Sequence, residues 1–368
     1  MLEFKKWLLQ MGGNVQFGDV SADRIRMNDF NRKKVVSEIS KGLKAVSDRF
    51  QDKHGIPLWR DELFKTNEFL SGSSLHLFNL KDISDEEFKK HKATVGDIDT
   101  QVDGEMKSQI DSFLKSISIG EKIGNIIFQG SKPSGDQFIT LWNIPSLGLN
   151  VQVDLELVGY SNGKPTPWST FSHSSAWEDI KSGVKGVFQK YILRSLNSRS
   201  AKDVLIQAKT SRGKDKILHT SELAFSLRGL RTKLSPVLDI NGKQLVKDGK
   251  LVYKEIDTED SFFETDLDIL FKVFFGIKGT PNEIEQFKSF VGILALAKKY
   301  FNKNDLKKIL NGFANLLWGS DAQSLVRGGP QEDFDTKKIP FDLMLSTFEV
   351  GKIEDYQAII DSFYKEYK

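Results

Sequence analysis

Three short stretches contain the residues of this chain that are best suited to chemistry. They are the turn Ser71-Gly72-Ser73-Ser74, the pair in Asp97-Ile98-Asp99 and the later Asp154. Carboxylate oxygens are the ligands that Mg²⁺ and Mn²⁺ prefer. A glycine lets the backbone approach a phosphate closely, and the amides at the start of a following helix point toward the anion. In this order the three stretches predict a site that holds a nucleoside triphosphate on two metal ions.

The spacing Asp-x-Asp alone is weak evidence, because it occurs three times, at Asp97/Asp99, Asp266/Asp268 and Asp333/Asp335. The second pair stands where a helix-forming segment begins, and acidic residues there favour the positive end of the helix dipole, so we expect it to cap a helix. The third pair lies in a loop rich in glycine and proline, where we expect it to be solvated. Thr94-Val95 precede the first pair, and a β-type backbone would place its carboxylates on one side and Ile98 on the other.

Asp154 lies in a segment from Asn150 to Val158 that alternates between aliphatic and polar residues. This period of two predicts a strand whose aliphatic side chains enter the core while Asp154 and Glu156 share the polar face. If Asp154 joins the first pair on a neighbouring strand, each like-charge pair at about 4 Å and an effective dielectric near 20 costs roughly 4 kcal/mol. Such a cluster is unfavourable unless protons or divalent cations neutralise it. The alternatives are separate surface acids on strand edges and a plain turn at the glycine and serines. Glu156 would either support Asp154 from the same face or simply face solvent.

Helical and extended segments alternate around these residues, which predicts an α+β chain. We expect a helix that ends at Gly55-Ile56-Pro57, a short helix after Ser74, a solvated charged insertion from Lys81 to Lys92 and an amphipathic helix from Met106 to Ile117. Strands are expected at Ile123 to Phe128, Phe138 to Trp142 and Asn150 to Val158, with a turn at Lys132-Pro133-Ser134-Gly135. A helix from Ala176 to Leu196 follows.

The remaining sequence predicts a β-hairpin and then a helical bundle. The turn dipeptides Asn241-Gly242 and Asp248-Gly249 place the hairpin between Pro236 and Tyr253. Helices are expected to begin at Pro281, at the capping residue Asn304, and near Asp342 and Glu354. The expected domains are an N-terminal helical segment over 1–60, a core over 61–205, a basic linker and β-hairpin over 206–258, and a C-terminal helical domain over 259–368.

The composition is ordinary for a globular protein and restricts the classes of function. The chain has 368 residues and a formal net charge of only +3, so a nucleic acid would have to be bound by a local basic patch. It contains no cysteine, which excludes disulfides, thiol nucleophiles and cysteine-ligated metal sites. No apolar run of about 18 residues is present, and the stretch from Met1 to Gln10 is too charged for a signal-peptide core. We therefore expect a cytoplasmic protein without a membrane partner.

Taken together, Gly72-Ser73, Asp97-x-Asp99 and an Asp154 between hydrophobic residues resemble the motifs of the polymerase-β-type nucleotidyltransferase superfamily. That superfamily includes CCA-adding enzymes and poly(A) polymerases. The resemblance covers residues 65–200 and implies a small mixed β-sheet core flanked by helices and followed by a helical domain. The gap between Ser73 and Asp97 is longer than is usual there, so the resemblance requires an insertion within it.

The resemblance also implies an activity. Asp97 and Asp99 would bridge two Mg²⁺ or Mn²⁺ ions about 3.5–4 Å apart, and Asp154 would ligate only the ion that activates an acceptor hydroxyl. That hydroxyl would attack the α-phosphorus of a nucleoside triphosphate such as ATP, and pyrophosphate would leave. Gly72, Ser73 and Ser74 would hold the β and γ phosphates. The acceptor that receives the NMP would be RNA, a small molecule or a protein.

Basic residues are concentrated between Lys181 and Lys233. Lys185 and Lys190 are candidates for binding the triphosphate, whereas Arg212, Lys214 and Lys216 are candidates for binding a polynucleotide acceptor. The alternative is a solvated helix face followed by a charged loop. The aromatic residues in this part of the chain would either stack on a base or form a buried cluster, and they are Trp168, Phe171 and Trp177.

Two other functions remain open from the sequence. A glycosyltransferase uses Asp-x-Asp to hold a metal ion and a nucleotide-sugar, but this explains neither Asp154 nor the glycine-serine turn. A non-catalytic nucleotidyltransferase-like module would bind nucleic acid or a protein partner. The presence of all three aspartates argues against a site that has lost its chemistry.

Overall fold

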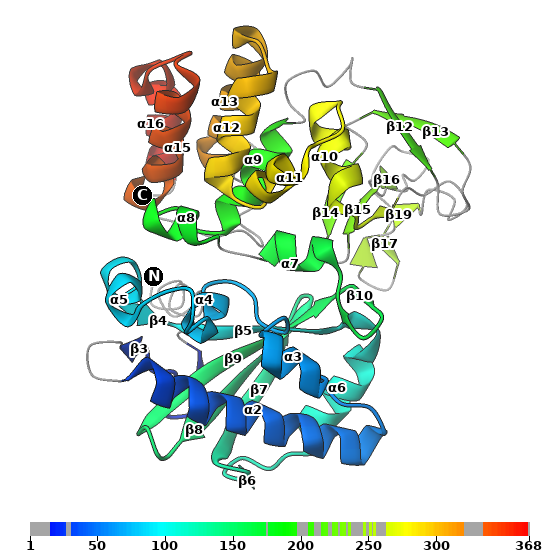
Figure 1. Cartoon of the computed structure of the whole chain (residues 1–368), viewed down its shortest axis with the longest axis vertical. Coiled ribbons are helices and arrows are strands. Elements are labelled where there is room, and N and C mark those ends of the chain that lie inside the picture. Colours follow the sequence, from blue (N-terminus) through cyan, green and yellow to red (C-terminus); the bar gives the residue numbers. More distant parts are fainter. Residues whose placement is uncertain are drawn as a thin grey trace. The chain divides into compact units, whose positions relative to one another are not determined.

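The computed structural model describes residues 15–26, 31–173, 176–196, 263–319 and 334–366, together with short strands between residues 205 and 254. The chain divides into two compact units (Figure 1). Unit 1 comprises Met1–Gln189, Lys288–Val291 and Gln323–Pro340, and unit 2 comprises Lys190–Phe287, Gly292–Ala322 and Phe341–Lys368. Helices and strands occur in both units, so the predicted α+β class is confirmed.

Unit 1 is built on a five-stranded mixed sheet with the strand order β5-β9-β8-β7-β6. Its strands are β5 (Asp97–Asp103), β6 (Lys122–Ile123), β7 (Ile126–Ser134), β8 (Gln137–Ile144) and β9 (Leu149–Val158). β5 runs parallel to β9, and the other neighbouring strands are antiparallel. The predicted strands at Phe138 to Trp142 and Asn150 to Val158 are confirmed, but the one at Ile123 to Phe128 is broken by a tight turn at left-handed Gly124, which separates β6 from the antiparallel β7. β7 then continues through Lys132-Pro133-Ser134, and the chain turns instead at Gly135, where φ is +64°.

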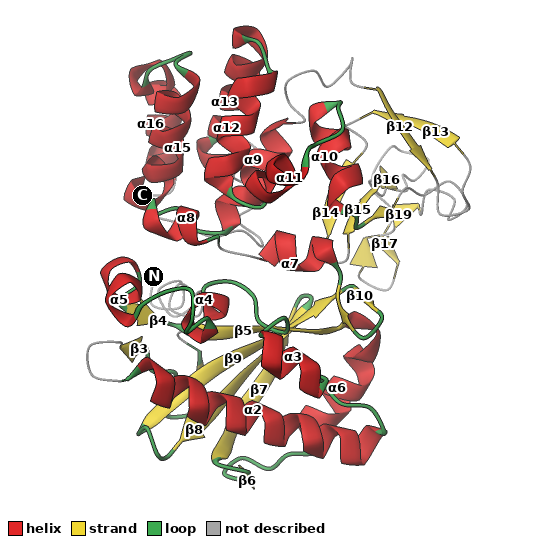
Figure 2. Ribbon diagram, viewed as in Figure 1, coloured by secondary structure: helices red, strands yellow, loops and turns green. Residues whose placement is uncertain are grey.

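Helices cover one face of this sheet (Figure 2). They are α2 (Arg32–His54), α3 (Asp61–Thr66) and α6 (Lys107–Lys115). Asn31 caps α2 by accepting from two backbone amides, and the helix ends at a left-handed Gly55, as predicted. The aliphatic residues of β5 and β9 face these helices and share one core with them, which includes Val35, Ile39, Leu43, Ile98, Val102, Ile110, Phe113, Val153 and Leu155.

A small N-terminal hairpin lies on the opposite face of the sheet. Its strands are β1 (Gln16–Phe17) and β2 (Val20–Ser21), and the residues around them pack on Ile139 and Leu141 of β8. The chain then forms β3 (Ile25–Arg26), which pairs with β4 (Thr94–Val95) just before β5. A second small hairpin, β10 (Tyr160–Ser161) and β11 (Lys164–Pro165), follows β9.

The charged stretch from Lys81 to Lys92 is not a solvated insertion, because it contains helix α5 (Asp85–His91), which packs into the core of unit 1. Ser84 caps this helix, acidic residues occupy its first turn and basic residues its last turn, an order that suits the helix dipole. Phe88 is fully buried and stacks on Trp177 with the ring centroids 6.1 Å apart. One large apolar residue thus anchors a helix whose other side chains are mostly polar.

The expected helix from Ala176 to Leu196 is broken into two. α8 (Trp177–Lys181) ends before Gly183, whose φ of +73° lies in the left-handed region, and α9 (Val187–Leu196) begins after it. The preceding α7 (Pro167–His173) carries Trp168 and Phe171, which are 1% and 2% exposed. The buried-cluster interpretation is therefore confirmed for these two aromatic residues.

Unit 2 contains α10 (Leu267–Phe275), α13 (Lys303–Trp318), the 3-10 turn η4 (Ile353–Tyr356), α16 (Gln357–Glu366) and parts of α9, α12 (Phe290–Tyr300) and α15 (Phe334–Phe348). Asp266 caps α10 by accepting from the amides of Asp268 and Ile269, as predicted. Helix α11 (Pro281–Phe287) begins at the predicted proline. Asn302 and not Asn304 caps α13, so the predicted start of that helix was wrong.

Helix α15 also begins earlier than its predicted start at Asp342. Asp335 therefore lies in the first turn of a helix, where a solvated loop was expected, while Asp333 falls outside the described residues. No helix in the described part of the chain is both long enough and apolar enough to cross a membrane.

The described residues between 205 and 264 of unit 2 form short antiparallel strands. β16 (Ser235–Pro236) pairs with β19 (Tyr253–Lys254), and β17 (Val246–Lys247) pairs with β18 (Lys250–Leu251), which matches the predicted hairpin. Further pairs were not predicted, and they join β12 (Leu205–Lys209) to β13 (Asp215–His219), and β14 (Leu223–Ser226) and β20 (Phe263–Glu264) to β15 (Gly229–Thr232).

Candidate metal centre

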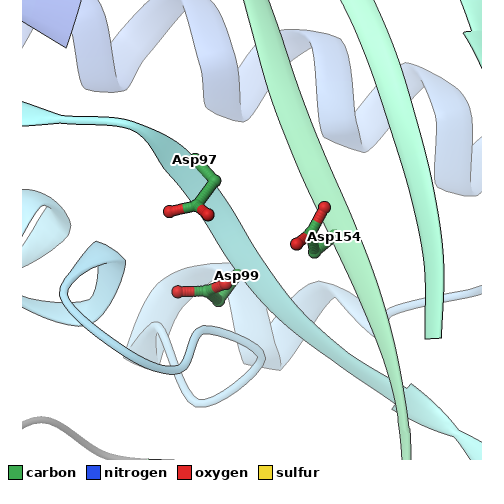
Figure 3. Close-up of side chains that lie close together, drawn as sticks. All are labelled: Asp97, Asp99 and Asp154. Atoms are coloured by element: carbon green, nitrogen blue, oxygen red, sulfur yellow. The ribbon is translucent and has the colours of Figure 1, made fainter. Parts of the chain in front are cut away.

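Three aspartates meet on the sheet face opposite α2 and α6. Asp97 and Asp99 come from the start of β5, and Asp154 comes from β9. The two strands pair in parallel with Asp99 directly opposite Asp154, so the alternation of side chains brings all three carboxylates to one face. One oxygen from each lies within 4.8 Å of those from the other two, and the side chains gather in one place between the strands (Figure 3). The structure thus brings together the acids that the sequence predicted as a cluster.

Burial makes this cluster electrostatically unfavourable. Burial away from solvent is the main cause of two shifts. It raises the pKa of Asp97, and it raises the pKa of Asp99 well above its usual value. Burial also raises the pKa of Asp154 to about 8, with the Asp97 carboxylate as the next cause. Protonation or cation binding would relieve the repulsion. Because the donors are all carboxylate oxygens, the residues fit Mg²⁺ or Mn²⁺ better than zinc.

The chain before the glycine-serine turn covers the outer edge of β5. This strand ends the sheet, and an unpaired edge would leave its backbone groups without partners. Leu70 forms an antiparallel bridge with Thr100, and the amide of Ser71 donates to the carbonyl of Asp99 at 3.1 Å. The turn therefore follows directly from a segment that is paired with the strand carrying the aspartates.

The turn itself lies against Asp99 and leads into the short helix α4 (Ser74–Phe78). Gly72 has a φ of +56°, and a Cβ at this position would collide with the Asp99 carboxylate. Ser74 Oγ accepts from the Asp99 amide at 2.9 Å and donates to the Asp97 carbonyl at 3.2 Å. Ser73 is half-buried, and its hydroxyl makes no capping bond to α4. Two of the predicted stretches are thus adjacent, and helix α5 accounts for the long gap between them.

Glu156 supports the turn from the neighbouring strand. It is half-buried, and its Oε2 accepts from Ser71 Oγ at 2.8 Å. Its negative charge also raises the pKa of Asp97, Asp99 and Asp154. Of the two interpretations that the sequence allowed, a supporting group fits and a simply solvent-facing residue does not.

Two further residues of the centre were not predicted from the sequence. Lys92 follows α5, and its positive charge lowers the pKa of Asp97 and Asp99. Nothing local marks it, because its position depends on the packing of α5. Gln152 lies on the same face of β9 as Asp154 and donates from Nε2 to Asp154 Oδ1 at 2.9 Å. The alternation of β9 contained a signal for Gln152, since it places this residue on the polar face.

The predicted basic residues have different outcomes. Lys185 lies in unit 1 and acts on the centre through Lys92. Burial is the main cause that lowers the pKa of Lys92, and the positive charge of Lys185 lowers this pKa further. Lys190 lies on α9 at the start of unit 2, and its role in triphosphate binding stays a prediction. Arg212 and Lys214 lie outside the described residues, and only the backbone of Lys216 in β13 is described. Their role in acceptor binding also stays a prediction.

Comparisons of the chain with protein-family models, with curated proteins and with solved structures found no match. The chemistry open to the centre follows from its own groups. Three carboxylates offer oxygen ligands to divalent cations, and a glycine turn packs closely against one of them. The positive charge of Lys92 acts on two of these carboxylates. This combination suits an anionic ligand that is bound together with divalent cations.

Proposed function

We propose that this chain is a metal-dependent nucleotidyltransferase, which transfers an NMP group from a nucleoside triphosphate to a hydroxyl acceptor. The observation that carries the proposal is the parallel register of β5 and β9, which sets Asp99 opposite Asp154 while Gly72 lies against Asp99. The order of the turn, the aspartate pair and the later aspartate supports it further, because polymerase-β-type enzymes share this order. A glycosyltransferase that holds its metal through Asp-x-Asp needs neither the turn nor Asp154.

In this reaction the acceptor oxygen forms a bond to the α-phosphorus. The bond between that phosphorus and the oxygen bridging to the β-phosphorus breaks, pyrophosphate leaves, and the acceptor proton passes to solvent. Two Mg²⁺ or Mn²⁺ ions, when bound, supply neutralisation of the charge that develops on these oxygens. Asp97, Asp99 and Asp154 are the residues that would hold them.

The remaining groups of the centre orient the triphosphate. Gly72 lets the turn lie directly against the Asp99 carboxylate because it has no side chain, and Ser73 keeps its hydroxyl free of the helix cap. The backbone amides of this turn would face the phosphate oxygens. Lys92 and Lys185 contribute positive charge that favours a polyanion over a neutral ligand. Glu156 holds the turn in place through Ser71. The chain would therefore act mainly by positioning the reactants and by preorganised charge.

A transfer assay tests the proposal. The protein is incubated with labelled nucleoside triphosphates, Mn²⁺ and separate RNA, protein and small-molecule acceptors, and label transferred to each acceptor is measured. Asp99→Asn is expected to lower the rate by about 10²–10³-fold or more, because it removes a carboxylate that would hold the ions that neutralise the reacting phosphate. Asp103→Asn is the matched control, since Asp103 also lies on β5 but caps a 3-10 turn, a role that asparagine can take over.

Equal transfer by the wild type and by Asp99→Asn would refute the proposal. Preferential binding of UDP-sugars over nucleoside triphosphates would favour the glycosyltransferase instead. Binding of RNA or DNA that weakens with salt, without any metal-dependent binding of nucleotides, would favour a non-catalytic module.

A further inference from the structure

Gln152 connects the metal centre to the N-terminal hairpin. Gln152 is 2% exposed and follows Val151 on β9, but its side chain lies on the face of Asp154 and not in the core that contains Val151 and Val153. The Nε2 atom donates to Asp154 Oδ1 at 2.9 Å, and the Oε1 atom accepts from the backbone amide of Val15 at 3.1 Å. Both ends of one buried amide are therefore engaged, one by a candidate metal ligand and the other by a segment 137 residues away in the chain.

The bond from Val15 decides the orientation of this amide. A backbone N–H can only donate, so it must meet the oxygen of Gln152, and the NH₂ group must then face Asp154. The reverse orientation would set two donors against each other at Val15 and two acceptors against each other at Asp154. A neutral donor on Oδ1 fixes the rotation of the Asp154 carboxylate and leaves its other oxygen for a cation.

The hairpin that supplies the Val15 amide is held by a small apolar cluster of its own. Val15 is fully buried against Ile139 and Leu141, apart from the larger core under α2 and α6. Gly130 makes room for the ring of Phe17, because a Cβ there would collide with it. A segment with few buried apolar neighbours opens at a lower free energy than the domain core does. Two hydrogen bonds between Asp23 and the backbone of Asn150 also hold the chain just after the hairpin. We therefore expect the hairpin to open at a lower free energy than the core of unit 1.

We propose that Gln152 is a positioning residue for the metal centre and that docking of the N-terminal hairpin sets the affinity of that centre for divalent cations. With the hairpin docked, the Val15 amide holds Gln152 in the orientation that donates to Asp154. With the hairpin released, Gln152 loses this constraint, and Asp154 loses its fixed orientation. The inference deepens the proposed function, and it depends on cation binding at the three aspartates but not on the identity of the acceptor.

Binding of Mn²⁺ alone provides the first test, by isothermal titration calorimetry on the full chain. Gln152→Met keeps the volume of the side chain but removes both hydrogen bonds, and we expect it to weaken Mn²⁺ binding by about 10–100-fold, as outer-shell substitutions at metal sites do. Val15→Pro removes the backbone donor and also changes a buried apolar side chain, but it leaves the bond from Gln152 to Asp154 possible, so we expect a smaller loss. Asn143→Leu is the matched control, because it deletes a side-chain amide on the same sheet that bonds to Asn150 and not to an aspartate.

Hydrogen exchange provides a second readout that a merely structural role would not change. If hairpin docking favours Mn²⁺ binding, then Mn²⁺ binding must favour docking by the same factor. We therefore expect Mn²⁺ to slow the exchange of the amides in residues 15–22 of the wild type and to leave their exchange unchanged in Gln152→Met.

The outcomes separate this inference from the proposed function. If the wild type and Gln152→Met bind Mn²⁺ equally, the inference is wrong while the proposed function stands. If Gln152→Met loses Mn²⁺ affinity and Asn143→Leu, at a comparable melting temperature, does not, the inference is supported even where no nucleotide transfer is found. A wild type that binds no Mn²⁺ overturns both.

Discussion

The two faces of the unit 1 sheet use the same strands for opposite purposes. On β5, Ile98 enters the core under α2 and α6, whereas Asp97 and Asp99 emerge on the other side. On β9, Val153 and Asp154 divide in the same way. Burial of the apolar face stabilises the folded protein. Burial of the acidic face destabilises it until a proton or a cation is bound. Stability and the candidate chemistry are therefore separated residue by residue along one pair of strands.

The largest expected effect lies on the apolar face. Ile98→Ala leaves a cavity in a fully buried position and should lower the free energy of unfolding by about 2–5 kcal/mol. Urea denaturation followed by tryptophan fluorescence measures this loss. The adjacent Asp97→Asn should show no such loss and should instead weaken Mn²⁺ binding. If both substitutions destabilised the protein equally, the separation of the two faces would not hold.

The next prediction concerns a substitution on the acidic face, Asp154→Asn, which should increase the free energy of unfolding by an amount that depends on pH. An aspartate in an unfolded chain has a pKa of about 3.9, whereas burial raises the pKa of Asp154 to about 8 in the folded protein. The folded state therefore holds the proton more tightly, and the metal-free protein should lose stability as pH rises from about 4 toward about 8.

Asp154→Asn removes this loss, because asparagine stays neutral at every pH. Near pH 8 without metal, the variant should be more stable than the wild type by an amount on the order of a few kcal/mol. Melting curves from pH 4 to 8 measure the difference, in the presence and absence of Mn²⁺. Mn²⁺ should raise the melting temperature of the wild type and not that of the variant. A variant that is less stable than the wild type at pH 8 would contradict the expectation.

A smaller effect is expected at the turn beside the acidic face. Gly72→Ala must adopt a left-handed backbone, which costs about 1–2 kcal/mol, and its Cβ must also displace the Asp99 carboxylate. Gly120→Ala is the control, because Gly120 has a φ of +85° but open space around its Cβ position. Both variants should lose stability in urea denaturation, Gly72→Ala by the larger amount, but only Gly72→Ala should lose Mn²⁺ affinity. Equal Mn²⁺ affinities would show that the turn does not constrain Asp99.

The smallest expected effect lies at Glu156. In Glu156→Gln the side-chain oxygen still accepts from Ser71, so the free energy of unfolding should stay within about 1 kcal/mol of the wild type. In Glu156→Ala this acceptor is lost, and an additional loss of about 1 kcal/mol is expected. Paired urea titrations measure the difference. Identical values for the two variants would mean that the bond to Ser71 does not hold the turn.

The sequence predicted well what depends on local pattern. The alternation from Val151 to Leu157 predicted β9 and placed Asp154 on its polar face, and the position of Asp266 before a helix-forming segment predicted a cap. Both features follow from neighbours within a few residues, so the local sequence contains the necessary information.

The sequence failed where a distant contact decides the structure. The stretch that became α5 is mostly polar, and contacts with distant residues, such as the packing of Phe88 against Trp177, show that it belongs to the core. The role of Gln152 depends on the amide of Val15, which no local pattern connects to it. The prediction of where α13 begins was wrong for another reason. Asn302 and Asn304 are both good capping residues, and residue type alone does not choose between them.

The parallel pairing of β5 with β9 has a consequence for the synthesis of this protein. Everything between these strands, including α6, β6, β7 and β8, leaves the ribosome before Asp154 can stand opposite Asp99. A nascent chain that stops before β9 carries only two of the three acids and lacks the partner strand. Divalent ions that bind at all three aspartates therefore stabilise the completed domain and give no advantage to its unfinished precursors.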